Sequence, residues 1–252
     1  MDSSWIERRR DWAGEQRRAG VEGIFRASAV LLPLPPSLHD SLRVPKGERA
    51  VLSPVRKDTL AGSPIARAVS ALTDVGASAF TVHMDDTGDG TCHQDILALA
   101  QASPLPILCA DAVLEPVQIV MARAHGAAAV TLSPRWTPDR ELRALYREAV
   151  ELGLEVVMRV SSSSELETAM SVRLGSADHS AARMIWVAGG PDTLARVSLA
   201  LPDYAVAIAE IDVDTDLASL DALGYEAFAG TPTSAQLDAV VDWTRSVGGP
   251  VH

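Results

Sequence analysis

Cysteine is scarce in this chain, and a long apolar run and an excess of basic residues are missing from it. The two cysteines, Cys92 and Cys109, are too few for a disulfide framework, and the first twenty residues carry charge without the apolar core of a secretory signal. We therefore expect a cytoplasmic protein. The longest apolar runs, such as Ala29–Pro35, are interrupted by proline and are far shorter than the ~20 residues that span a bilayer, so we expect no membrane segment.

The missing basic excess also bears on the partners of the protein. A formal charge of -11 and a pI near 4.9 argue against binding to nucleic acid, which requires a basic face. With 252 residues, of which 47% are hydrophobic, the chain can bury one large core. We expect an extension and connector over residues 1–48 and one domain over residues 49–252.

The strongest positive pattern is a repeated join of a helix end, a glycine and a short apolar strand, at Gly76, Gly126, Gly153 and Gly224. Glycine ends the helix in a left-handed conformation, and a continuous apolar run is typical of a strand buried on both faces. Strands that alternate with helices indicate a parallel sheet. The pattern predicts eight strands, near Ala50–Val55, Ala79–His83, Ile107–Ala110, Ala128–Leu132, Glu155–Val160, Met184–Val187, Ala205–Ile208 and Ala227–Ala229. The predicted fold class is therefore α/β, a (β/α)8 TIM barrel with an N-terminal helical extension.

Polar residues mark several predicted helix starts. Ser4 and Glu7 form a capping-box pattern before an arginine-rich helix, which we interpret as a solvated helix packed on the barrel. Further starts are expected at Ser63, Thr137 and Ser163. The proline-rich segment that follows the extension is interpreted as an ordered connector.

Chemistry in such barrels takes place where the strands end, at the carboxyl face. The stretch Cys109 to Asp111 ends the third predicted strand with a thiol, a methyl group and a carboxylate. Arg56 and Arg159 stand at other strand ends, and a guanidinium can bind an anion through two parallel hydrogen bonds but cannot act as a base. Two arginines suggest an anionic ligand, unless they pair with Asp111 or Glu210 in a structural network.

The sequence resembles the indole-3-glycerol phosphate synthase family. Residues 105–132 are similar to the family's third strand, helix and fourth strand, in which the strand ends V-L-R-K-D-F; residues 151–170 and 222–230 also follow family patterns. The resemblance implies a TIM barrel and a ring-closing reaction that releases carbon dioxide and water from a carboxyphenylamino deoxyribulose phosphate. It also implies that a third-strand lysine is the acid and that first- and fifth-strand glutamates handle protons.

Most of these family residues are replaced. The lysine position falls on Ala110, the first-strand glutamate on Pro54 and the fifth-strand glutamate on Arg159. The seventh-strand glutamate falls on Ile208, or on Glu210 if the following loop is two residues shorter. A positioned proton-transfer group contributes ~10²- to 10⁴-fold, so we expect the parent synthase activity to be lost.

The candidate site combines these positions. Asp111 and Glu210 are the predicted proton-transfer residues. The predicted ligand-binding residues are Arg56, Arg159, His83, Cys109, Ser161, Gly189 and Gly190. We expect no metal and no cofactor. Two readings stay open: a repurposed lyase- or cyclase-type enzyme acting on an anionic small molecule, and an inactive pseudoenzyme that serves as a binding or protein-interaction module. The oligomeric state, the substrate and the pathway are not fixed by the sequence.

Overall fold

A computed structural model describes residues 3–56, 59, 64–82, 92–172, 182–230, 232, 234 and 236–248. Its strands form a closed barrel in the order β1-β2-β3-β4-β5-β6-β7-β8, and all eight neighbouring pairs are parallel. The strands are β1 Ala50–Val55, β2 Ala79–Val82, β3 Ile107–Cys109, β4 Ala129–Leu132, β5 Glu155–Val160, β6 Met184–Val187, β7 Val206–Ile211 and β8 Ala227–Gly230. The predicted TIM barrel is confirmed, and each predicted strand lies within a few residues of an observed one.

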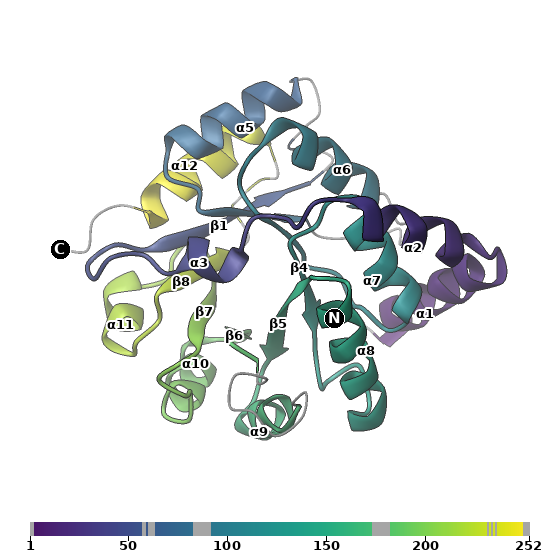
Figure 1. The fold of residues 1–252 in the computed structure, drawn as a ribbon. Helices are drawn as coiled ribbons and strands as arrows, with labels where there is room; N and C mark the ends of the chain where they lie inside the picture. The colour runs from purple at the N-terminus through teal and green to yellow at the C-terminus, as the bar shows by residue number, and fades with distance from the viewer. Residues whose placement is uncertain are drawn as a thin grey trace.

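Helices follow the strands and surround the barrel (Figure 1). They are α5 Ile65–Asp74, α6 Cys92–Ala102, α7 Pro116–Ala124, α8 Asp139–Glu151, α9 Ser163–Ser171, α10 Pro191–Ser198, α11 Leu217–Ala222 and α12 Leu237–Val247. The four predicted helix-ending glycines have positive φ values, between 74° at Gly153 and 98° at Gly76. Residues other than glycine rarely adopt such values. These glycines therefore stop each helix and turn the chain into the next strand.

The extension before β1 contains three helices, α1 Ser3–Arg18, α2 Val21–Leu31 and α3 Leu38–Leu42. Helices α1 and α2 pack against α7 at the rim of the molecule (Figure 1), whereas α3 closes the amino end of the barrel with Leu38 and Leu42. Glu155 at the start of β5 fixes α3, because its Oε2 accepts hydrogen bonds from the backbone N–H groups of Leu38 at 2.6 Å and His39 at 3.0 Å.

Two predicted helix starts were wrong by a residue or more. Ser4 lies inside α1 instead of preceding it, and α8 has Pro138 at its N-cap with no side-chain hydrogen bond, so Thr137 is not a cap. The predicted start of α9 at Ser163 is confirmed, and the residue before it, Ser162, is the N-cap, whose Oγ accepts a hydrogen bond from the Glu165 N–H. Ser63 lies outside the described residues.

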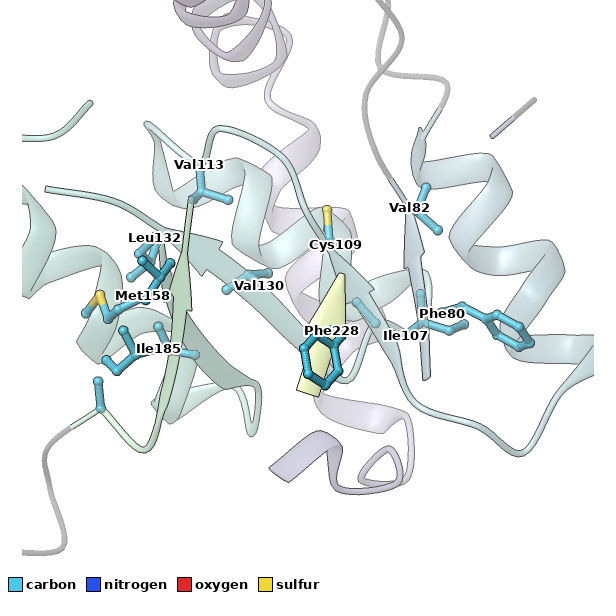
Figure 2. Packing of buried hydrophobic residues seen from close by; sticks show 14 of the residues in the cluster. Phe80, Val82, Ile107, Cys109, Val113, Val130, Leu132, Met158, Ile185 and Phe228 are labelled. Carbon is cyan, nitrogen blue, oxygen red and sulfur yellow. The ribbon is translucent and has the colours of Figure 1, made fainter. Parts of the chain in front are cut away.

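Strand residues alternate between two cores. The outer core fills the space between sheet and helices and includes Phe80, Cys109 and Phe228, drawn in Figure 2. The inner core fills the barrel and includes Leu52, Val157, Trp186 and Ile208. Because successive side chains of a strand point to opposite faces, this alternation decides which residues reach the barrel mouth.

Candidate functional site at the carboxyl face

Arg159, Trp186 and Glu210 form a polar cluster at the carboxyl end of the inner core. Val157 and Ile208 belong to the inner core, so Arg159 and Glu210, two residues further along β5 and β7, also point inward. The Arg159 guanidinium donates to Glu210 Oε2 at 2.7 Å, and the Trp186 indole Nε1 donates to the same oxygen at 3.0 Å. The side chains of Arg159 and Glu210 are 19% and 36% exposed, so solvent reaches the pair.

Two indole rings flank the Arg159 guanidinium. Its central carbon lies 5.6 Å from the ring centroid of Trp136, which follows β4, and 5.9 Å from that of Trp186. Both distances fall within the range of cation–π attraction. Trp136 in turn meets Trp5 of α1 edge to face, with 6.1 Å between the centroids. Sequence reasoning missed Trp5 and Trp136, because no spacing pattern connects a residue of the extension with the loop after β4.

Asp111 does not join this cluster. It forms an ion pair with Arg9 of α1, and both side chains are fully buried. Gln118 Nε2 lies 3.4 Å from the same Asp111 oxygen, Oδ2. Burial raises the pKa of the Asp111 carboxyl, and the Arg9 guanidinium opposes that rise. The structural alternative paired Arg56 and Arg159 with Asp111 or Glu210. Arg159 does pair with Glu210, but the partner of Asp111 is Arg9 of the extension, which lies in the helix that the sequence analysis interpreted as solvated.

Arg56 and Ser161 lie at the carboxyl ends of β1 and β5. Arg56 is exposed, and its backbone N–H donates to Thr59 Oγ1 at 3.1 Å. Ser161 donates from its backbone N–H and its hydroxyl to Glu165 Oε2, at 2.7 and 3.0 Å, and accepts a hydrogen bond from the Arg135 guanidinium at 3.2 Å. Ser161 thus links the loops that follow β4 and β5.

The remaining predicted site residues are dispersed. Cys109 is 1% exposed within the outer core, so its thiol points away from the barrel interior (Figure 2). Gly190 is the N-cap of α10, and a Cβ added there would meet open space, whereas one added at Gly189 would lie 2.9 Å from Thr193. His83 lies outside the described residues.

The described residues do not offer a metal site or a membrane span. Among them, no group of three or more His, Cys, Asp or Glu side chains is placed to hold a metal ion. The same part of the chain contains no helix that is both long and apolar enough to cross a bilayer.

The geometry defines a TIM barrel whose polar cluster lies at the carboxyl face, where enzymes of this fold have their active sites. Comparison with known proteins identifies the family. The sequence profile described as "Indole-3-glycerol phosphate synthase" matches residues 16–177, about two thirds of the chain. The chain belongs to the indole-3-glycerol phosphate synthase family.

Curated relatives agree with this assignment. The indole-3-glycerol phosphate synthase of Opitutus terrae is 30% identical over 185 residues, which cover 69% of this chain and 66% of the relative. That of Exiguobacterium sibiricum is 32% identical over 162 residues, which cover 62% of this chain and 61% of the relative. The alignments thus span slightly less than two thirds of these relatives, and the matched profile ends before β6.

Solved structures support the fold alone. A tryptophan synthase from M. tuberculosis with aminoacrylate bound has a TM-score of 0.58 at 16% identity, over 85% of this chain and 96% of that one. A structure described as native KDPGal has a TM-score of 0.57 at 19% identity, over 78% of this chain and 91% of that one. Such low identities carry no information about activity.

Proposed function

We propose that this family member binds a small anionic molecule at its carboxyl face and acts on it as a repurposed lyase- or cyclase-type enzyme. The observation that carries the proposal is the partly exposed Arg159–Glu210 pair, whose guanidinium lies near the rings of Trp136 and Trp186. An anion that competes with Glu210 for the Arg159 guanidinium would gain charge-assisted hydrogen bonds in a partly desolvated place. The exposed Arg56 at the end of β1 is the second proposed anion contact.

Glu210 is the proposed proton-transfer group. Its Oε2 already accepts hydrogen bonds from Arg159 and Trp186, which hold the carboxylate in place. When an anion engages Arg159, Glu210 keeps the indole contact and is free to exchange a proton with the ligand. Asp111 is buried in an ion pair with Arg9. We therefore assign Asp111 the role of holding the loop after β3 and not that of contacting the ligand.

We propose further that the parent synthase reaction is not retained. Ala110 stands where the resemblance places the acid, and Pro54 and Arg159 stand where it places the glutamates. The loop after β7 adds Asp212, Asp214 and Asp216 at a place where the family binds phosphate, and three carboxylates disfavour a phosphate there. Expression in a tryptophan auxotroph that lacks the synthase should therefore not restore growth, and restored growth would contradict this part of the proposal.

A second candidate function is a pseudoenzyme that uses the barrel as a binding or interaction module. Its supporting observation is that both predicted proton-transfer carboxylates are engaged by arginine, Asp111 by Arg9 and Glu210 by Arg159. In an enzyme, ligand binding has to release at least one of these carboxylates from its arginine. In a pseudoenzyme, both carboxylates can stay paired.

Ligand screening separates the two candidates. Carboxylates and phosphates, aromatic and aliphatic, are titrated while tryptophan fluorescence is recorded, because Trp136 and Trp186 flank Arg159. For a true ligand, Arg159→Ala should weaken binding by ~10- to 100-fold, as expected for the loss of a charge-assisted contact. The matched control is Arg143→Ala, because Arg143 is bonded to Ser171 on the outer helices. Strong destabilisation by Arg159→Ala with unchanged binding would reject the anchor role and favour the pseudoenzyme.

A further inference from the structure

The outer surface of α2 and of the segment that follows it is unusually apolar. Five of the ten large hydrophobic residues exposed in the described part of the chain come from this one stretch. They are Ile24 (72% exposed), Val30 (72%), Leu31 (85%), Leu32 (39%) and Leu34 (76%). We call the exposed residues 23, 24, 27, 28 and 30–34 the α2 patch. Single exposed apolar residues are ordinary, but a contiguous group of them marks an interaction surface.

The α2 patch contains no charged side chain. Every exposed residue between positions 23 and 34 is uncharged, in a protein of which 22% is charged. The one hydroxyl of the patch, that of Ser28, donates to the Ile24 carbonyl at 3.2 Å within the helix. The charged residues of α2, Glu22 and Arg26, pair with each other at 2.9 Å, and Arg26 also reaches Glu148 of α8 at 2.6 Å.

The helix that carries the patch is firmly attached to the barrel. Its opposite side packs on α7 (Figure 1). There, Val21 and Phe25 contact a small core that contains Val117 and Met121. The segment after α2 is held by Arg123, whose guanidinium donates to the Leu32 and Pro33 carbonyls at 2.9 Å each. The exposure of the patch is therefore a property of a fixed surface.

We propose that the α2 patch binds a second copy of this chain, in a two-fold symmetric dimer with α2 packed against α2 of the partner. In such an isologous contact each patch meets itself, so an uncharged apolar surface is its own complement. Gly23 and Ala27 lie one turn apart on the exposed side, and small residues let two helices approach closely.

The size and charge of the patch favour this occupant over a lipid surface. Five side chains exposed to these extents present on the order of 600 Å² per copy, so a symmetric pair would bury ~1,200 Å², the lower end of stable specific interfaces. Each copy carries a charge of -11, which repels both a second copy and an anionic membrane. Two copies that meet through the uncharged α2 patch do not bring like charges into contact. An anionic membrane extends beyond the patch, so it would also meet the negative charges of the surrounding protein surface.

The dimer would leave the candidate site open. Leu34 of the patch lies beside Gly153, which precedes β5 and so belongs to the amino end of the barrel. The Arg159–Glu210 pair lies at the carboxyl end. The proposal therefore stands independently of the proposed function.

Sedimentation velocity over about 1 to 200 µM protein tests the proposal. The wild-type chain should form a dimer, and Leu31→Glu and Ala27→Arg should each raise the dimer dissociation constant at least ~10-fold, because a charge would be buried at the contact. Leu31 and Ala27 are exposed, so both variants should keep the wild-type circular dichroism spectrum and melting temperature. The matched control is Leu199→Glu, at an 87% exposed leucine after α10, which should leave the dimer unchanged.

Three results would overturn it. The first is a wild-type chain that stays monomeric over the whole range. The second is a dimer that Leu31→Glu and Ala27→Arg leave as stable as the wild type. The third is a monomer that floats with phosphatidylglycerol vesicles through the same residues, which would assign the α2 patch to a membrane surface.

Discussion

At the scale of single residues, the buried ion pair between Arg9 and Asp111 joins the extension to the loop after β3. Removing one partner of a buried pair leaves a charge without compensation, which costs ~3–5 kcal/mol. Arg9→Ala should therefore lower the free energy of unfolding by that amount in urea titrations. Arg17→Ala, which breaks an ion pair to Glu115 from a 60% exposed side chain, is the control and should cost at most ~1 kcal/mol. Equal losses in the two variants would contradict the assigned burial.

His93 makes the stability of the protein depend on pH. The ring is 2% exposed, stacks on Trp12, and lies near Arg9 and His125; burial, followed by these two charges, lowers its pKa from 6.5 to about 3. Below pH 6.5 the unfolded chain binds a proton that the folded chain does not take up until about pH 3. His93 therefore lowers stability by up to ~1.4 kcal/mol for each pH unit of this window, and its cost is absent above pH 6.5.

The variant His93→Phe isolates this dependence. It keeps an aromatic ring against Trp12 and cannot bind a proton, so its stability should fall less steeply between pH 6.5 and pH 4 than that of the wild type. Urea titrations at several pH values measure both slopes. Parallel curves would show that His93 titrates in the folded protein as it does in the unfolded chain.

At the scale of elements, α3 depends on Glu155. This carboxylate accepts hydrogen bonds from two backbone N–H groups at the start of α3 and from the Ser37 hydroxyl at 2.9 Å. Glu155→Ala should remove ~1–3 kcal/mol, because the buried N–H groups of Leu38 and His39 lose their acceptor. Glu155→Gln keeps one acceptor oxygen and should recover part of the loss; thermal unfolding of the two variants makes the comparison.

At the scale of the whole molecule, we predict a single cooperative unfolding transition that includes the extension. The contacts that join residues 1–48 to the barrel include Arg9 with Asp111, Arg123 with the carbonyls of the connector, and Glu155 with α3. Tryptophan fluorescence, to which Trp5 and Trp12 of α1 contribute, should change together with far-ultraviolet circular dichroism. Two separated transitions would instead mark the extension as an independent unit.

The fold was largely predictable from the sequence and the site only in part. Glycine stops and apolar runs are local signals, so Gly76, Gly126, Gly153 and Gly224 located the strands correctly. The sequence placed Arg159 and Glu210 at strand ends that meet at one face, and their pairing followed only as one of the alternatives left open. The pairing of Asp111 with Arg9 did not follow from the sequence. Arg9 lies 102 residues away and reaches Asp111 because α1 packs beside it, and no sequence pattern gives the position of α1.

The same long separation has a consequence for synthesis on the ribosome. At ~5–20 residues per second, the chain between Arg9 and Asp111 takes roughly 5–20 s to be made, and α1 must wait through that interval without its buried partner. Barrel closure waits longer, because β1 pairs with β8 and β8 is translated last among the strands. A nascent chain paused before β3 would therefore leave Arg9 without its carboxylate partner, and the order of translation sets the order in which this protein can assemble.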